Sequence, residues 1–488
     1  MTGASPGRGA RTGFLLEGLA LAAAAAILGS QLLVPPIVGL ADNGDFDRVM
    51  EPCGIRADAP YADRFFAWVC DCYRFDPRGI RPGGFLTSER LFVLTAIPVN
   101  RLFSTPGGFR IEAMGSVQAA ALLAALGLLL AATRPLPKAS RIGAAALLLL
   151  IFTDVAYASY LNSFYSEPAS LIFLLLWVAL ALAAARVTRP GVFAAFLAAA
   201  ALFVATKPQN ALLSIPLAAL AARLATRLPG LWRRRGFAAA GLLALLGVWY
   251  HGRAPREMRR VILYDAVFRG LLAHSSDPVR DLEALGLPRD LAPLAGKTAY
   301  QPGSRFDDPA LEPEFFARTS FGDVFRFYAA RPGRALVALA RAAPRAFHMR
   351  PPHLGNYEKA SGRPAGSLAR SFAYWSDLKS WLPLPAAALA LFFAASVAAA
   401  LRLRGRIPAA RAASEIWLVV ALIAAYQFAL VLLGEGDHEL EKHLFLFHAC
   451  VDLQVVGLAL SAPALFRGPL ARSYARQEVR DQEGRIKT

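Results

Sequence analysis

The chain lacks the sequence features that are typical of several large classes of protein. Its 488 residues include only four cysteines and seven histidines, and these do not follow the spacing of a zinc site. The chain has no glycine-rich nucleotide loop and no heptad repeat. Acidic residues are also few, at 35 against 53 basic ones. The sequence therefore argues against a zinc protein, a nucleotide-loop enzyme and a coiled coil.

Long apolar segments take the place of those motifs. Hydrophobic residues make up 56% of the chain, and the mean hydropathy is +0.41. A helix needs about 20 mostly apolar residues to cross a membrane, and ten segments approach that length. We expect an all-α polytopic membrane protein with about ten transmembrane helices, at residues 14–38, 116–133, 141–161, 166–186, 190–206, 208–226, 236–250, 381–401, 413–433 and 443–466.

Basic residues gather in every second loop between these segments. Lys- and Arg-rich loops of membrane proteins stay in the cytoplasm, so the net charge of +18 is a topology signal and does not indicate a nucleic-acid partner. The first apolar segment has no convincing cleavage site after it, and we interpret it as a retained helix. Both termini are then predicted to be cytoplasmic. The basic positions are Arg134, Lys138, Arg141, Arg186, Arg189, Arg223, Arg227, Arg233, Arg234, Arg235, Arg402, Arg404, Arg406, Arg411 and a tail from Arg467.

The intervening loops are predicted to face the exterior. Within the first of them, Leu91–Phe103 is apolar but too short to span, which favours an interfacial or re-entrant helix. Between Phe315 and Phe347, aromatic and Arg residues mix as in helices on the outer membrane surface. The exterior parts are 39–115, 162–165, Lys207, 251–380 and 434–442. The chain then divides into a transmembrane module (1–250), an exterior region (251–380), C-terminal transmembrane helices (381–466) and a basic cytoplasmic tail (467–488).

Three of the four cysteines fall in the first exterior loop. Exterior thiols can form disulfides, so Cys53 could pair with Cys70 or with Cys72. One thiol would remain in either case. A metal site needs more ligands than these three residues supply nearby.

Three carboxylates lie within six residues at the start of the same loop. Asp42, Asp45 and Asp47 flank Asn43-Gly44, a pair that favours a tight turn because both residue types tolerate positive φ. Such a turn would fold Asp45 back toward the membrane surface. A solvated acidic loop is the alternative, and the other polar groups on the same face decide between the two.

Two polar clusters interrupt apolar segments on that predicted face. Glu167 begins a helix with Pro168 in its first turn, where a carboxylate either caps the helix or serves a site. Lys207 and Gln209 break a long apolar run. Lys207 is interpreted either as a phosphate anchor or as a lysine that snorkels to the interface.

The last exterior loop carries the fourth cluster. Asp437 precedes Lys442 and His443, and we expect the latter two to open a helix and point at an anion from its N-terminal end. A plain solvated loop is the alternative. Four clusters on one membrane face describe a site, because carboxylates serve as general bases and cations hold a phosphate at head-group depth.

These motifs resemble the GT-C superfamily of integral-membrane glycosyltransferases, which carry an acidic motif in the first exterior loop and take sugars from polyprenyl-phosphate carriers. The stretch Asn43-Gly44-Asp45-Phe46-Asp47-Arg48-Val49 is similar to the opening motif of bacterial glycan-biosynthesis hexose transferases. Further similar stretches are Ser163–Glu167, Lys207–Asn210, Asp281–Gly296, Phe327–Arg334 and Lys442–Leu444.

The resemblance implies transfer of a hexose from a polyprenyl-phosphate carrier to a cell-surface glycan or lipid-linked acceptor, in the bilayer of a bacterial inner (cytoplasmic) membrane. Asp45, or else Asp42, would be the general base, and Glu167 would orient the acceptor or support the base. No cofactor is implied, and the cations make a divalent metal unnecessary. Residues assigned to the phosphate or sugar are Lys207, Gln209, Lys442, His443, Asp437 and Arg48.

Two other classes of function stay open at this point. A transporter or flippase of lipid-linked sugars also needs charges at membrane depth, but the internal repeat common in transporters is not found in the sequence. A non-catalytic subunit of a glycan synthase complex is the third possibility.

Overall fold

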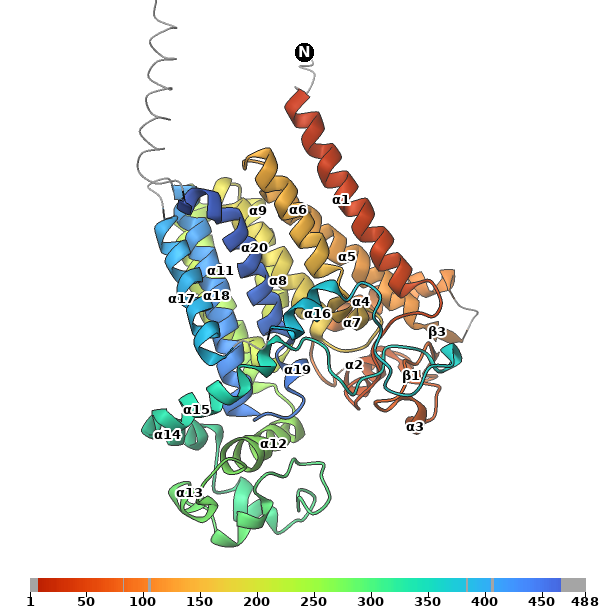
Figure 1. The fold of residues 1–488 in the computed structure, drawn as a ribbon, viewed down its shortest axis with the longest axis vertical. Coiled ribbons are helices and arrows are strands. Elements are labelled where there is room, and N and C mark those ends of the chain that lie inside the picture. Colours follow the sequence, from red (N-terminus) through yellow and green to blue (C-terminus); the bar gives the residue numbers. More distant parts are fainter. Residues whose placement is uncertain (1–7, 82, 104–106, 383–384, 405–407, 467–488) are drawn as a thin grey trace, which may run out of the picture.

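The computed structural model describes residues 8–81, 83–103, 107–382, 385–404 and 408–466. The tail predicted to be basic and cytoplasmic, 467–488, lies outside the described residues, as does Arg406. Long helices lie side by side in a bundle (Figure 1). They are α1 (Arg8–Leu32), α5 (Ile111–Ala132), α6 (Lys138–Phe152), α7 (Val155–Leu161), α8 (Glu167–Arg186), α9 (Pro190–Val204), α10 (Ser214–Ala225), α11 (Gly230–Gly252), α17 (Ala386–Arg402), α18 (Pro408–Gly434) and α20 (Phe445–Phe466).

Five helices in the described residues are long and apolar enough to cross a membrane. The pair α6 and α7, bent by 59° at a short break, makes a sixth if it forms one span. The helices α9 and α17 are apolar but shorter. The chain is thus a mostly helical membrane protein, as predicted. Each of the ten predicted segments contains helix, but a total of about ten crossings stays a prediction.

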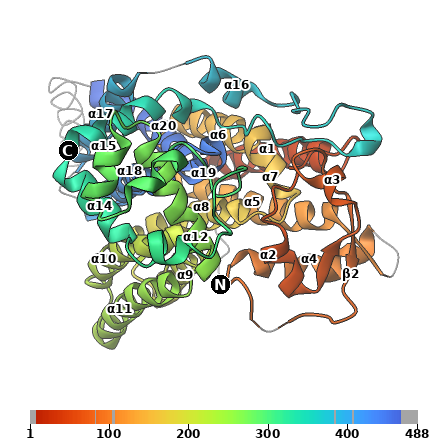
Figure 2. The same ribbon diagram turned by 90° about the horizontal axis from the view of Figure 1, so that it is seen from below.

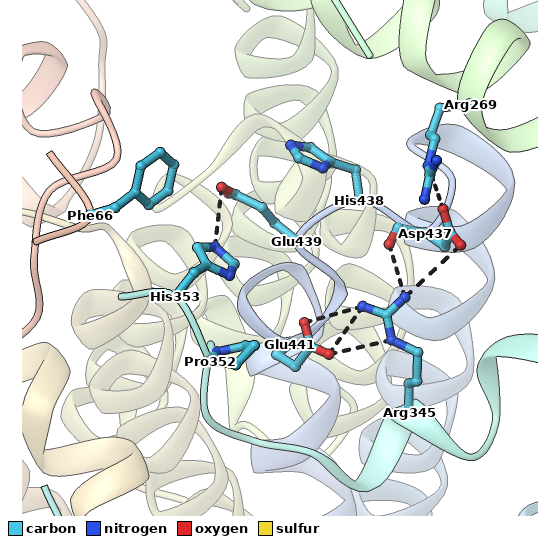
Figure 3. A pocket seen from close by; sticks show the side chains of 9 residues that line it. All are labelled: Phe66, Arg269, Arg345, Pro352, His353, Asp437, His438, Glu439 and Glu441. Carbon is cyan, nitrogen blue, oxygen red and sulfur yellow. Dashed lines mark hydrogen bonds and ion pairs between the residues drawn. The ribbon is translucent and has the colours of Figure 1, made fainter. Parts of the chain in front are cut away.

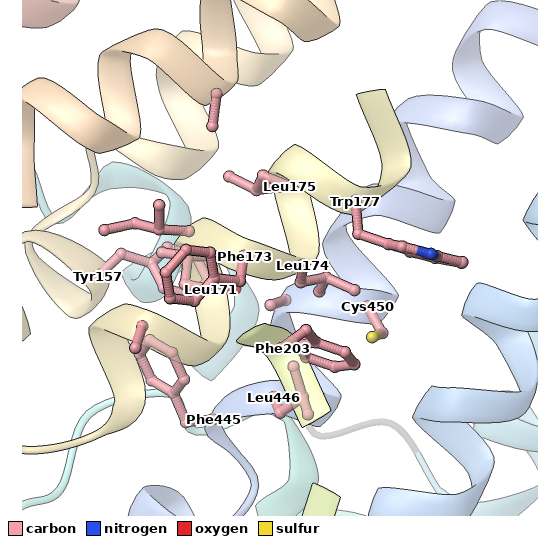
Figure 4. Close-up of a cluster of buried hydrophobic side chains, with 14 of the residues drawn as sticks. Tyr157, Leu171, Phe173, Leu174, Leu175, Trp177, Phe203, Phe445, Leu446 and Cys450 are labelled. Atoms are coloured by element: carbon pink, nitrogen blue, oxygen red, sulfur yellow. The ribbon is translucent and has the colours of Figure 1, made fainter. Parts of the chain in front are cut away.

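The centre of the bundle is α8. It is apolar all round, as a helix surrounded by others must be, and 78% of its most apolar window is buried. Its side chains meet those of α9 and α20 in a continuous core, where Trp177, Phe203 and Cys450 are fully buried (Figure 4). Burial of a large apolar side chain contributes about 1.5–3 kcal/mol. The N-terminus of α8, with Glu167, is therefore held in a fixed place.

The shorter elements gather at the end of the bundle opposite the N-terminus (Figures 1 and 2). The helices there are α2 (Asp47–Met50), α3 (Tyr61–Arg64), α4 (Glu89–Val99), α12 (Arg256–Tyr264), α13 (Pro278–Ala284), α14 (Phe321–Ala330), α15 (Pro332–Ala342), α16 (Tyr374–Ser380) and α19 (Leu440–His443). Brief 3₁₀ turns connect them: η1 (Glu51–Cys53), η2 (Asn100–Leu102), η3 (Pro208–Leu213), η5 (Arg289–Leu294), η7 (Arg345–Phe347) and η8 (Lys359–Ser361). Two turns, η4 (Asp265–Leu272) and η6 (Glu312–Phe316), are π-helical.

The helix α4 covers the stretch expected to be interfacial or re-entrant. Its 11 residues rise about 16 Å, which is too short to cross a membrane. Its first residue, Glu89, is fully buried and accepts a hydrogen bond from the Ala169 backbone N–H (3.0 Å). Glu89 of α4 thereby satisfies one of the backbone N–H groups that have no partner within the first turn of α8.

A small antiparallel sheet departs from the all-α expectation. The strands β1 (Ile55–Ala57), β2 (Cys72–Phe75) and β3 (Gly108–Arg110) lie in that order. Tyr73 of β2 and Phe109 of β3 are paired and buried, and both rings contact Phe164. Strands of three or four residues are too short to show a period-2 pattern in the sequence. For that reason the sheet was not predicted.

Backbone pairing joins the first exterior loop to a segment about 300 residues later. The Gly39 N–H donates to the Asn356 carbonyl (3.0 Å) and the Ala41 N–H to the Gly355 carbonyl (2.8 Å). Isolated bridges extend this contact from Val38 to Tyr357. The residues just before the acidic motif are therefore fixed against the rest of the exterior end.

All four cysteines are free. The pairing of Cys53 with Cys70 or Cys72, left open by the sequence, is not formed. Cys53, Cys70 and Cys450 are buried, whereas Cys72 is exposed. The chain therefore carries one natural labelling site.

We predict that a membrane-impermeant maleimide labels Cys72 in intact spheroplasts, because 39–115 is predicted to face the exterior. Labelling should vanish in Cys72→Ser, since the other thiols are buried. Arg289→Cys in that background tests the region 251–380, because the Arg289 side chain is 75% exposed. Labelling of either site only after permeabilisation would place these loops in the cytoplasm and contradict the predicted topology.

Candidate active site

A cavity of about 770 Å³ opens at the junction of the bundle and the exterior elements. Its volume is typical of small-molecule sites, which occupy about 300–1,000 Å³. All four polar clusters singled out in the sequence contribute to it. Its polar lining includes Asn43, Asp45, Arg48, Tyr165, Glu167, Lys207, Gln209, Asp265, Tyr300, Glu435, His438, Glu439, Lys442 and His443.

Asp45 lies between two cations in this cavity. Its Oδ2 contacts Lys442 Nζ at 2.5 Å and its Oδ1 contacts Arg48 Nη1 at 2.6 Å. Lys442 is buried, with 3% of its side chain exposed. Its ammonium group also lies 4.6 Å from the centre of the Tyr165 ring, within the range of a cation–π interaction.

Asp42 takes a different place from Asp45. Its Oδ1 accepts the backbone N–H groups of Gly44 (2.7 Å) and Phe46 (3.3 Å), and its Oδ2 pairs with Arg64. Gly44 has φ of 97°, so the expected turn is formed and needs the conformational freedom of glycine. Asp42 is 2% exposed and does not line the cavity. Asp42 thus shapes the turn that presents Asp45, and its assignment as the alternative base stays a prediction.

Glu167 and Lys207 form the second ion pair of the cavity, with Nζ and Oε1 2.5 Å apart. The Glu167 side chain is 2% exposed, and Lys207 reaches it from an extended backbone just before η3. Gln209 is turned toward the bundle, where its amide donates to Gln427 of α18 (2.9 Å). Gln209 thus ties the Lys207 loop to α18.

Lys442 and His443 do not open a helix. They end the four-residue helix α19, and Leu444 separates them from α20. The prediction that they point at an anion from a helix N-terminus is therefore wrong, because they stand at the C-terminal end of α19. His443 Nδ1 instead contacts Glu435 Oε2 at 2.9 Å.

Two predicted residues lie away from the cavity. Asp437 lines a neighbouring hollow of about 550 Å³, where Arg269 Nε lies 2.7 Å from its Oδ1 (Figure 3). Asp47 is 44% exposed and lies 3.7 Å from Arg64.

The charged partners determine the protonation of these groups. Burial favours the neutral form of Asp45, but the nearby Lys442 and Arg48 outweigh it and hold the pKa of Asp45 well below its usual range. Burial likewise opposes the charge of Lys442, yet Asp45, Glu439 and Glu167 raise its pKa. In the unliganded cavity Asp45 is therefore a weak base.

Several lining residues were missed by the sequence analysis. Asp265 begins η4, and burial raises its pKa to about 7, against the hydrogen bond from Ala299. Glu439 accepts from the Asn43 amide (2.9 Å) and lies 3.9 Å from Lys442. Tyr165 donates to the Ala41 carbonyl (2.8 Å). Tyr165 lies two residues before Glu167 in a stretch already singled out, and Glu439 lies in the loop of the fourth cluster. Nothing in the sequence distinguishes Asp265.

Among the residues that the structure describes, no three His, Cys, Asp or Glu side chains are grouped as metal ligands. The carboxylates of the cavity contact cations or amide groups of the chain instead. The arrangement therefore gathers several carboxylates and several cations around one cavity.

One family model matches nearly the whole chain. It is described as the YfdI N-terminal transmembrane domain and covers residues 10–480. No curated protein matches the chain. The matched range includes every residue that lines the cavity.

We predict a pH-dependent stability from His443. Burial favours its neutral form, but Glu435 outweighs burial and raises the pKa of His443. The pair therefore stabilises the fold fully below the ordinary His pKa of about 6.5, and this stabilisation is lost as pH rises through the raised pKa. Tm measured in detergent from pH 6 to 9 should fall more steeply for the wild type than for His443→Gln. Parallel curves would contradict a charged His443.

Proposed function

The chain belongs to the family of the YfdI N-terminal transmembrane domain, and from this membership and the chemistry of the cavity we propose that it is a GT-C-type membrane glycosyltransferase. It moves a hexose from a polyprenyl-phosphate carrier to an acceptor hydroxyl at the exterior face of a bacterial inner membrane. The observation that carries the proposal is the cluster of Asp45, Lys442, Lys207 and Glu167 in one cavity at the end of the bundle.

The lining of the cavity suits a lipid-linked sugar. Beside the charged groups, apolar side chains form part of the wall: Phe65, Phe66, Phe85, Phe164, Met258, Val261 and Ile262. Such a wall accommodates the first prenyl units, while the charged part accommodates the phosphate and sugar. In a carrier that lies in the membrane, the apolar prenyl chain meets the charged phosphate at head-group depth. In the protein, the apolar and charged parts of the cavity meet where α12 and the loop of Lys207 adjoin the bundle.

The transfer step involves one bond formed and one broken. The acceptor hydroxyl oxygen forms a bond to the anomeric carbon of the donor. The bond between that carbon and the phosphate oxygen breaks, and its electron pair goes to the leaving polyprenyl phosphate. The hydroxyl proton passes to Asp45.

Lys207, Lys442, His443 and Arg48 stabilise the leaving phosphate as its charge increases. Each of these cations contacts a carboxylate of the cavity, which keeps it in place, and Lys442 and Arg48 share Asp45. The proposal requires no divalent metal. Glu167 acts through Lys207, which it orients.

The binding of the donor also activates the base. When Lys442 turns toward the phosphate, Asp45 loses its nearest cation, and the pKa of Asp45 rises toward its ordinary value. Asp45 is then able to accept the proton only when a donor is bound. A transporter would need no such coupling between a carboxylate and the phosphate site.

We predict that Asp45→Asn lowers the turnover of sugar transfer about 10²- to 10⁴-fold, the usual contribution of general base catalysis, while donor binding persists. Proteoliposomes with polyprenyl-phosphate sugars, scored for both transfer and transport, provide the measurement. Asp47→Asn is the control because Asp47 is outside the cavity. Normal transfer by Asp45→Asn would remove the proposed base, and transport without transfer would favour the flippase.

We predict that Lys442→Met and Lys207→Met each lower kcat/KM for the donor about 10- to 150-fold, because a hydrogen bond to a charged group contributes about 1.5–3 kcal/mol. Lys359→Met, on the surface with Asp63, is the matched control. Lys207→Met also leaves the buried Glu167 carboxylate without its cation, which can destabilise the fold. The double variant Lys207→Met/Glu167→Gln removes both charges, so a loss of donor use that remains in it does not come from an unpaired carboxylate. Unchanged donor kinetics in both variants would show that neither lysine holds the phosphate and would favour the alternative of lysines that snorkel to the interface.

A further inference from the structure

A second hollow adjoins the cavity and shares part of its wall. The hollow is lined by nine residues, and three of them, Phe66, His438 and Glu439, also line the cavity. Its volume of about 550 Å³ is within the range of small-molecule sites. In Figure 3 these three side chains lie together on one side of the hollow, away from Arg345. We call Phe66, His438 and Glu439 the shared wall.

The backbone of the shared wall is strained. Four residues other than glycine have positive φ in the described part of the chain, and two of them are Phe66 (φ 60°) and Glu439 (φ 44°). Such conformations are unfavourable and persist where the surrounding structure enforces them, most often at functional sites. Two of the three residues of the shared wall are therefore held by the surrounding structure in a conformation typical of functional sites.

Glu439 faces both sides. Its Oε2 accepts from the Asn43 amide (2.9 Å) on the cavity side, and its Oε1 lies 3.4 Å from His353 Nε2 on the side of the hollow. Lys442, the partner of Asp45, lies 3.9 Å from the same Oε2. Glu439 thus connects the hollow to Asp45 through Lys442.

The other charges of the hollow are already paired. Arg345 Nη2 lies 3.1 Å from Glu441 Oε1, and Arg269 Nε lies 2.7 Å from Asp437 Oδ1. Gly436 enables the second pair, because a Cβ there would lie 2.9 Å from Gly270 in η4, next to Arg269. An anionic ligand finds no unpaired cation and a cationic ligand finds no unpaired carboxylate.

His438 completes the lining with a polar group that is available to a ligand. Its imidazole has no hydrogen-bond partner within the described ranges, and Figure 3 draws it without a contact. Burial lowers the pKa of His438 against the pull of Glu439, so the ring is neutral and offers one donor and one acceptor. The ring of Phe66 supplies an apolar surface beside it.

We propose that this hollow binds the acceptor, and that the acceptor is an uncharged saccharide. Hydroxyl groups both donate and accept, so they bridge paired charges without disturbing them, and the Phe66 ring packs on the C–H face of a sugar. The attacking hydroxyl extends from the hollow, past the shared wall, to the donor in the cavity. This inference rests on the proposed function for its reaction, but the binding of a saccharide to the hollow does not depend on transfer.

Binding without donor tests the site itself. The intact protein in detergent is titrated with maltotriose, as a neutral trisaccharide, and with trigalacturonic acid, as its anionic counterpart, and Tm is recorded. We expect stabilisation by the neutral sugar alone, lost in His438→Ala. Stabilisation by both sugars, by the acid alone or by neither would overturn the proposal.

Acceptor kinetics test the role of the hollow in transfer. His438→Ala should raise KM for a neutral acceptor about 5- to 10-fold, and by more than it raises KM for the donor, since a typical hydrogen bond to the acceptor is lost. Glu441→Gln removes the nearer carboxylate partner of Arg345 and leaves Asp437 at 3.9 Å, so it should improve use of a uronate-bearing acceptor relative to a neutral one. Glu415→Gln, whose partners Arg223 and Arg404 belong to another ion-pair group, is the matched control.

These outcomes separate the two proposals. Transfer activity with unchanged acceptor KM in both hollow variants would overturn the acceptor site and leave the enzyme intact. Saccharide binding that is lost in His438→Ala, without transfer from any donor, would overturn the glycosyltransferase and leave the binding site.

Discussion

The buried ammonium group of Lys442 is the constraint on which this site depends. A charge with 3% of its side chain exposed is costly unless it is paired, and its partners are Asp45, Glu439 and the face of Tyr165. These partners come from the first exterior loop, the last exterior loop and the segment before α8. Stabilising one lysine therefore requires all three segments to meet, and the cavity lies where they do.

The location of the site was predictable from the sequence, because polar residues that interrupt apolar segments stand out against a lipid environment. Glu167 and Lys207 were found in this way, and the structure pairs them. Their individual roles were less predictable. Asp42 and Asp45 have the same chemistry and lie three residues apart, yet the turn at Gly44 makes one a structural acceptor and leaves the other in the cavity.

Contacts between distant segments account for most of what the sequence did not reveal. Glu439 and Asp265 look like ordinary polar residues in exterior segments, and their importance comes only from the residues opposite them. The strands β1 to β3 are too short to leave a pattern in the sequence, and α19 has only four residues and is separated from α20 by Leu444. Helix periodicity identifies long elements well, but it does not resolve the single turns that position Lys442 and His443.

The order of synthesis gives the ion pair between Asp45 and Lys442 a further consequence. The two residues are 397 positions apart, so at ~5–20 residues per second the ribosome needs roughly 20–80 s to supply the lysine after the aspartate. During that interval the acidic turn of residues 42–47 lacks the cation that pairs with Asp45 in the complete chain. The cavity is therefore completed by the last hairpin to enter the membrane, and a nascent chain has no assembled site until its biogenesis is nearly finished.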